Sequence, residues 1–425
     1  MKKILCGLLA AVLSLGFAPS AFAQSYAEQA RARGLETQNG KIVVNDDISV
    51  SADYDWTRLA DQKITLNVYN WGLYISDGSD ESVDILSAFE KLTGIELNYT
   101  TYDSNESMYA KIKSGGASYD VVVPSDYMVG KLIQEDMLAP LDYKNIPNAA
   151  KINPGYRGLE YDPTDTYSVP YTWGIVGLIY NTTMVEEPPT SWADMWDPQY
   201  TGSILMFNNS RDAVAIAAKK LGLSMNPSSV EEVEQCMTEL KNQKNMVQAY
   251  VMDEIFDKMA GGEAALAPYY AGDAITMIQD NPDLAFVFPK EGSNLYVDAM
   301  CIPKNCKNKE AAEIFINYMC ETDVAAANCD YTGYSTPIDE VRESLDDELK
   351  NSPIAYPDAD VIERSEVFTT LPAEVNAAMD QGWSDMKSFD ENGSGWMVVG
   401  LMVIALALSC FNIWRKLRAK MRNDY

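Results

Sequence analysis

Residues 64–102, "ITLNVYNWGLYISDGSDESVDILSAFEKLTGIELNYTTY", decide the fold class of this chain. Residues 64–70 and 95–102 are rich in the β-branched and aromatic side chains that are typical of strands. Residues 82–94, between them, carry apolar side chains at helical spacing and end at Gly94. Strand, helix and strand in this order predict one unit of an α/β fold with parallel strands.

The same alternation continues toward the C-terminus. Helical spacing returns at residues 105–115 and 127–137, on either side of an apolar strand at 119–125. The second half repeats the style, with strands expected at residues 202–208, 284–289 and 295–303 and helices at 211–222, 231–244 and 308–320. The whole chain is therefore predicted to be an α/β protein with a mainly parallel sheet.

Aromatic and hydroxyl side chains stand directly after two of the predicted strands. Trp71 and Tyr74 follow the first strand, and Ser125 and Tyr127 follow the strand at 119–125. Ligands of α/β sheets bind outside the carboxyl ends of the strands. We therefore expect these side chains to line a ligand site.

Charge and composition exclude several classes of function. The 425 residues, enough for two domains, include 62 acidic and 33 basic side chains, a net charge of −29, and no histidine. Nucleic acid is a poor partner for such a chain because its phosphates need a basic surface. The lack of histidine excludes Ser-His-Asp and Cys-His catalysis and His-rich zinc sites. A cationic ligand is favoured.

The two ends of the chain predict export and a membrane anchor. Residues 1–23 have two lysines, an apolar run and a small-residue cleavage site, as in a secretory signal peptide. Residues 396–414 are uncharged, begin and end with Trp, and are long enough to cross a lipid bilayer. The basic tail 415–425 belongs in the cytoplasm by the positive-inside rule. We expect a protein on the outer face of the cytoplasmic membrane, in a periplasm or at the cell surface.

The cysteines predict no metal site. Two of the seven fall in the apolar end segments, no metal-ligand spacing occurs, and an odd set of five remains: Cys236, Cys301, Cys306, Cys320 and Cys329. An exported chain permits disulfides, so a Cys301–Cys306 or a Cys320–Cys329 disulfide remains an open alternative.

The strand-end residues combine the two groups that bind ammonium ions. An aromatic face attracts a cation through its quadrupole, and a carboxylate binds an ammonium by charge-assisted hydrogen bonds. The expected strand ends supply both types: Trp71, Tyr74, Tyr127, Tyr269, Tyr270 and Tyr296, with Asp273 and Asp298.

Seven motifs together resemble the spermidine/putrescine-binding proteins of bacterial ABC importers, over residues 66–387. They are "VYNWGLY" (68–74), "YDSNESMYAKIKSG" (102–115), "YDVVVPSDYMV" (119–129), "YSVPYTWG" (167–174), "SWADMWDPQYTGSIL" (191–205), "FPKEGS" (288–293) and "GYSTP" (333–337). The resemblance implies a two-lobed type II periplasmic-binding-protein fold that closes on a polyamine. It also implies a monomer that works with membrane permease subunits, without catalysis and without a cofactor.

This fold implies a division of the chain in which each lobe is built from two segments. The expected parts are a signal peptide (1–23), an N-terminal spacer (24–63), lobe 1 (64–170 with 297–338), lobe 2 (171–296 with 339–390), a linker (391–395), a transmembrane helix (396–414) and a basic cytoplasmic tail (415–425).

The resemblance also assigns ten ligand-binding positions. They are Trp71, Tyr74, Ser125, Tyr127, Asp212, Tyr270, Asp273, Tyr296, Asp298 and Tyr334. The chain departs from the spermidine binders at Leu73 and Asn209, where they have acids, and at Phe368, where they have a Gln. Asp273 matches the putrescine binders. We therefore expect putrescine to bind at least as well as spermidine.

Two other functions remain as alternatives. The Tyr269–Tyr270 pair would suit a binding protein for another solute such as ferric iron. The enzyme alternative is a carboxylate hydrolase or a Ser-Lys transpeptidase anchored outside the cell. For the latter, the sequence "SDMK", residues 384–387, fits the SxxK motif, although no partner motif accompanies it.

Overall fold

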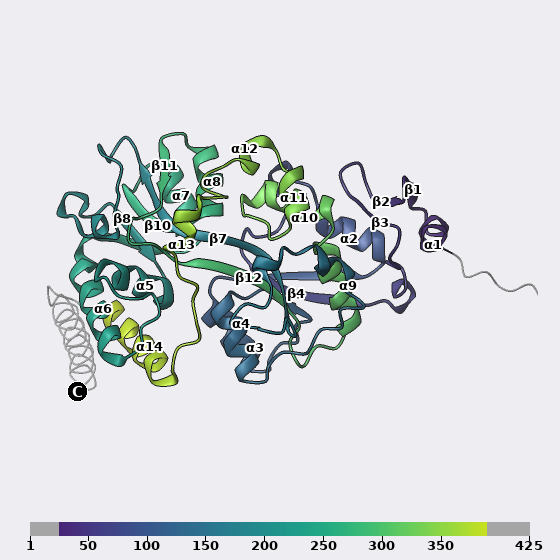
Figure 1. Ribbon diagram of the computed structural model, residues 1–425, viewed down its shortest axis with the longest axis horizontal. Helices are drawn as coiled ribbons and strands as arrows, with labels where there is room; N and C mark the ends of the chain where they lie inside the picture. Colours follow the sequence, from purple (N-terminus) through teal and green to yellow (C-terminus); the bar gives the residue numbers. More distant parts are fainter. Residues whose placement is uncertain (1–24, 389–425) are drawn as a thin grey trace, which may run out of the picture.

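The computed structural model describes residues 25–388. A mixed β-sheet runs through the middle of the molecule, with helices around it (Figure 1). Within the described residues the sheet has nine strands: β4 (Thr65–Trp71), β5 (Glu96–Tyr102), β6 (Val121–Val122), β7 (Ser168–Asn181), β8 (Ile204–Phe207), β9 (Val247–Val251), β10 (Leu266–Tyr270), β11 (Leu284–Val287) and β12 (Leu295–Cys301).

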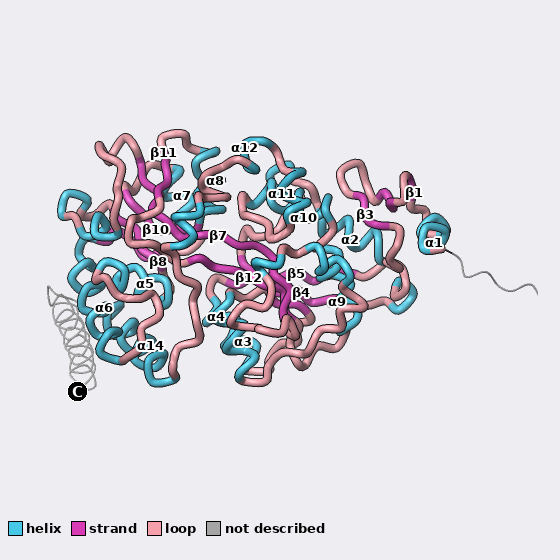
Figure 2. The backbone as a smooth tube through the Cα atoms, viewed as in Figure 1, coloured by secondary structure: helices cyan, strands magenta, loops and turns pink. Residues whose placement is uncertain are grey.

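The order of the strands divides the sheet into two lobes. It reads β5-β4-β6-β12-β7-β10-β8-β9, with β11 paired to β7. The outer pairs β4–β5 and β8–β9 are parallel, as expected, but β7 is antiparallel to β12, β10 and β11. The strand β7 serves both lobes, because it pairs with β12 on one side and with β10 on the other, and all of its 14 residues are buried. Figure 2 shows the strands passing continuously from one half of the molecule to the other.

Helices cover both lobes. The half that contains β4 and β5 carries α2 (Ile85–Thr93), α3 (Asn105–Lys113), α4 (Asp126–Gln134), α9 (Lys309–Met319), α10 (Thr322–Thr332) and α11 (Asp339–Ser344). The half that contains β8 and β10 carries α5 (Ser210–Lys220), α6 (Val230–Gln243), α7 (Ile255–Ala260), α8 (Ala271–Asp280) and α14 (Ala373–Ser388). Two short helices, α12 (Asp347–Lys350) and α13 (Ala359–Glu363), lie on the path between them. The proposed residue bounds of the two lobes stay a prediction.

Capping residues in the local sequence explain where the helices α2 and α5 begin and where α2 ends. Asp84 accepts a hydrogen bond from the backbone of Ser87 and caps α2, which ends at Gly94 in the left-handed conformation. Asn209 caps α5 in the same way by accepting from the backbone N–H of Asp212. The cap therefore places Asp212 in the first turn of α5, where the helix dipole favours a carboxylate.

Residues 25–63 form a small addition to the lobe that contains β4. They comprise α1 (Tyr26–Ala32) and a three-stranded sheet of β1 (Glu36–Gln38), β2 (Lys41–Val43) and β3 (Ser49–Ser51). Trp56, which is 1% exposed, packs edge-on against Tyr318 of α9. The segment expected as a spacer is thus packed onto the lobe by its own apolar side chains.

The expected fold class needs one correction, because it included a C-terminal transmembrane helix. The segment 396–414 lies outside the described residues, as do the expected signal peptide, the linker and the tail. Within residues 25–388, no helix has the length and apolar character that a membrane crossing requires. The helix nearest the segment, α14, has 16 residues and carries charges such as Glu374 and Lys387. The two-lobed α/β architecture therefore stands without the membrane helix.

The five cysteines in the described part of the chain are free thiols. Cys301 and Cys320 are buried, and the Cys306 thiol donates to Asp120 Oδ1 at 3.2 Å. Neither of the two pairings that the sequence left open is formed.

Candidate ligand-binding site

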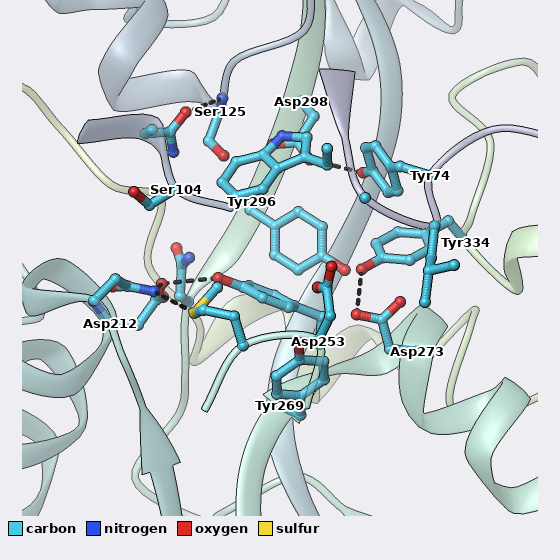
Figure 3. Close-up of a pocket in the computed structure, with 18 of the residues that line it drawn as sticks. Tyr74, Ser104, Ser125, Asp212, Asp253, Tyr269, Asp273, Tyr296, Asp298 and Tyr334 are labelled. Atoms are coloured by element: carbon cyan, nitrogen blue, oxygen red, sulfur yellow. Dashed lines mark hydrogen bonds between the residues drawn. The ribbon is translucent and has the colours of Figure 1, made fainter. Parts of the chain in front are cut away.

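A cleft lies where the loops at the strand ends of the two lobes meet. Figure 3 shows its lining side chains, with aromatic rings and carboxylates converging on a common space. All ten positions expected from the sequence line this cleft: Trp71, Tyr74, Ser125, Tyr127, Asp212, Tyr270, Asp273, Tyr296, Asp298 and Tyr334. The structure therefore brings the ten together, and their roles as ligand contacts stay a prediction.

The end of β4 places the first aromatic pair. Trp71 is half-buried, and its indole N–H donates to the carbonyl of Val123 at 3.0 Å. Tyr74 is buried, and the hydroxyl of Tyr171 holds its backbone carbonyl at 2.7 Å. The Tyr74 hydroxyl in turn donates to Asp298, so both rings are held before any ligand arrives and binding would cost little side-chain entropy there.

Asp298 lies on β12 at a register shift between Asp298 and Ala299. It is 5% exposed, and its Oδ2 accepts a 2.7 Å hydrogen bond from the Tyr74 hydroxyl. Its Oδ1 and the hydroxyl oxygen of Tyr296 are buried and have no partner within residues 25–388. Burial raises the pKa of Asp298 to about 6. A buried acceptor without a donor suits a ligand that brings its own donor.

Asp212 lines a different part of the cleft from Asp298. Its Oδ2 accepts from the Tyr270 hydroxyl and from Asn209 Nδ2, both at 2.8 Å. Burial raises its pKa, and the hydrogen bond from Tyr270 partly opposes this shift. The Asn at position 209 is therefore a donor to the acid beside it.

Asp273 stands in the first turn of α8. Its Oδ2 accepts a 2.9 Å hydrogen bond from the Tyr334 hydroxyl. Burial raises its pKa to about 8, and the carboxylates of Asp253 and Asp298 add to the shift. A cation in the cleft would oppose these shifts, because it favours the charged form of each acid.

Two carboxylates that sequence reasoning missed also line the cleft. Glu106, in the first turn of α3, accepts from the Tyr127 hydroxyl at 2.9 Å, and burial raises its pKa. The sequence could have indicated Glu106, because it lies soon after the strand predicted at residues 95–102, where lining residues are expected. Asp253 follows β9, a strand that the sequence pattern did not indicate.

The remaining lining residues contribute mostly apolar and amide surface. They are Gly72, Leu73, Ser104, Asn105, Asn209, Met252, Phe256, Tyr269, Asn294 and Phe368. The three positions at which the chain departs from the spermidine pattern are thus all at the cleft.

The charged side chains in the described lining of the cleft are all acidic. Its described lining includes five carboxylates and neither lysine nor arginine. The nearby cation, Arg211, is 3% exposed and lies behind the lining, with its Cζ 4.2 Å from the ring centroid of Phe368 and 5.6 Å from that of Tyr127. Burial lowers the pKa of Arg211 to about 10, so it stays charged at neutral pH.

Both rival functions find little support in the arrangement. Tyr269 is 1% exposed and stacks on Phe207, while the Tyr270 hydroxyl is bonded to Asp212. Residues 384–387 lie on α14, where Lys387 Nζ donates to Asn208 at 2.9 Å, and they do not line the cleft.

Comparison with known proteins identifies a family match. Residues 84–357 match the family model described as "Bacterial extracellular solute-binding protein". The spermidine/putrescine-binding periplasmic protein of Escherichia coli K12 is 37% identical over 309 residues, which cover 72% of this chain and 87% of the relative. The putrescine-binding periplasmic protein PotF of the same strain is 27% identical over 78% of this chain and 93% of its own length.

A solved structure agrees with these relatives. The crystal structure of the spermidine/putrescine ABC transporter substrate-binding protein PotD of Streptococcus pneumoniae superimposes with a TM-score of 0.65 at 36% identity. The alignment covers 76% of this chain and 99% of that chain. The similarity therefore spans both lobes and the cleft between them.

Proposed function

This chain belongs to the bacterial extracellular solute-binding proteins, in the family of the spermidine/putrescine-binding proteins, and we propose that its cleft binds a polyamine. The family consists of binding proteins, so the chain is the substrate-binding component of an importer and not an enzyme. Its relatives are periplasmic, which supports export. We propose that it delivers its ligand to the permease of an ABC importer outside the cytoplasmic membrane.

One observation carries the polyamine assignment. Five carboxylates and a set of tyrosine and tryptophan rings line a single cleft whose described lining has no basic side chain. Each ammonium of a polyamine needs a charged hydrogen-bond partner, and its methylene chain needs an apolar wall. The acids would bind the ammonium ends, and rings such as Trp71 and Tyr270 would cover the chain between them.

The proposed binding mode closes the lobes and involves no covalent chemistry. Closure removes water from the cleft and strengthens each contact between ammonium and carboxylate. The acids expected to carry these contacts are Asp212, Asp273 and Asp298. The chain has Leu73 and Asn209 where the spermidine binders have acids, so putrescine is expected to bind at least as well as spermidine, with spermine weaker.

Calorimetric titration of the full chain tests the proposal. Putrescine, cadaverine, spermidine and spermine are compared with 1,4-butanediol, which has the chain length of putrescine but carries hydroxyls in place of ammoniums. Saturable binding of the amines and none of the diol is expected. Equal binding of putrescine and the diol would overturn the proposal, because the carboxylates would then have no role.

A further inference from the structure

Asp253 differs from the other acids of the cleft in having no partner. It follows β9 and lies exposed at the rim. Within residues 25–388 its carboxylate makes neither a hydrogen bond nor an ion pair. A tyrosine hydroxyl donates to each of the other four acids: Glu106, Asp212, Asp273 and Asp298. Asp253 is therefore the cleft acid whose hydrogen-bonding capacity is wholly available to a ligand.

The carboxylate of Asp253 reaches across the cleft to the backbone of the other lobe. A Cβ atom added to Gly72, just after β4, would lie 2.4 Å from Asp253 Oδ2 and 3.5 Å from its Cγ. A larger residue at position 72 would force the Asp253 carboxylate to swing away, so glycine there permits this approach. The strands β4 and β9 lie near opposite ends of the sheet, and their loops meet here.

The acidic surroundings of Asp253 favour the binding of a cation. Partial burial raises its pKa, and the carboxylates of Glu254 and Asp103 raise it further. Position 73, directly after Gly72, offers no acid, because it is occupied by Leu73, which is 52% exposed and has a φ of 49°. A positive group beside Asp253 would relieve the repulsion among these acids and favour the charged form of its carboxyl.

We propose that Asp253 binds an ammonium group of the polyamine at the mouth of the cleft, and that Gly72 is glycine so that this acid can reach the opposite lobe when the cleft closes. This inference rests on the proposed function. It assigns one carboxylate a ligand contact that links β9 to β4. Binding at this point would favour closure, because the ammonium contact and the approach of the two loops form together.

Calorimetry with putrescine on variants of the full chain tests the ligand contact. Asp253→Asn keeps the shape and removes the charge, and Asp253→Ala removes both. Each is expected to weaken binding by about tenfold, the effect of one charge-assisted hydrogen bond. Asp257→Asn is the matched control: it removes an exposed charge from the same segment, on α7, and does not line the cleft.

A double-variant cycle tests the role of Gly72. Gly72→Ala is expected to weaken binding because its methyl group displaces the acid. In the Asp253→Ala background the same change should cost nothing further, since the clashing carboxylate is gone. Gly116→Ala is the control, because a Cβ there meets nothing nearer than Ser114 Oγ at 3.6 Å.

The outcomes separate the two proposals. If the unchanged chain binds no polyamine, the proposed function fails and this inference fails with it. If the unchanged chain binds but Asp253→Asn and Asp253→Ala stay within twofold of it, the inference alone is overturned. Additive losses in the cycle would overturn the role of Gly72. Thermal unfolding of each unliganded variant confirms that a weakened variant is still folded.

Discussion

The hydroxyl of Tyr74 donates a 2.7 Å hydrogen bond to Oδ2 of Asp298, 224 positions further along the chain, and leaves Oδ1 buried without a partner within residues 25–388. This contact joins the loop after β4 to strand β12. It orients the carboxylate, because the Tyr74 side chain is buried and its backbone carbonyl is held by the Tyr171 hydroxyl. The unpartnered oxygen is then presented to the cleft at no further cost in ordering.

Asp298→Ala is expected to weaken putrescine binding by about a hundredfold or more, since removing one partner of a buried charged pair costs about 2–5 kcal/mol. Calorimetry measures the change. Asp283→Ala removes an exposed acid outside the cleft and serves as the control. Affinity within twofold of the unchanged chain would mean that Asp298 does not contact the ligand.

Trp71→Ala is expected to cost less than Asp298→Ala, because a cation–π contact contributes about 0.5–2 kcal/mol. The loss should be similar for putrescine and cadaverine, since the contact of a ring with the methylene chain does not depend on the length of that chain. Trp196→Ala is the matched control, because that ring packs under Lys220 and does not line the cleft. A larger loss from Trp71→Ala than from Asp298→Ala would contradict the assignment of the charged contact.

Binding should weaken as the pH falls from 8 to 6. Burial raises the pKa of Asp273 to about 8 and that of Asp298 to about 6, so the unliganded cleft takes up protons over this range. Aliphatic amines keep their charge here, because their pKa is about 10. An ammonium binds the ionised acids and must displace these protons. Titrations at pH 7 in buffers of different ionisation enthalpy should therefore detect proton release.

The matched variant for this pH dependence is Asp273→Asn. It should reduce the change in affinity between pH 6 and 8, which Asp273 dominates, and leave the weakening below about pH 6 that Asp298 causes. An affinity that is constant from pH 6 to 8 in the unchanged chain would contradict the raised pKa values.

Asp273→Asn should also stabilise the unliganded protein at alkaline pH. The pKa of Asp273 is about 8 in the folded state against an ordinary value of 3.8, so the folded state prefers the protonated acid. The unfolded chain loses this proton near pH 4, and the folded state therefore loses stability as the pH rises from about 4 to about 8. The gain in Tm from Asp273→Asn should be larger at pH 8 than at pH 5. An equal gain at both values would locate the effect in packing instead.

Local patterns predicted much of the fold and of the site. Tyr296 and Asp298 are two positions apart on one strand, so they share a face wherever that strand lies in the sheet. Tyr270 and Asp273 span the end of β10 and the first turn of α8, where α/β sheets present ligands. The central antiparallel strands were not foreseen, since a fully buried strand such as β7 reads the same in either direction.

The sequence by itself determined the kinds of side chain at the strand ends, the excess of acid and the family. Only the tertiary structure decided which groups meet. Asp253 could not be found in advance, because β9 is mostly half-buried and shows no clear alternation of apolar residues. Its place opposite Gly72 depends on the order of strands across the whole sheet. Periodicity is a local property set by backbone geometry, whereas the pairing of distant loops is set by packing between segments far apart in the chain.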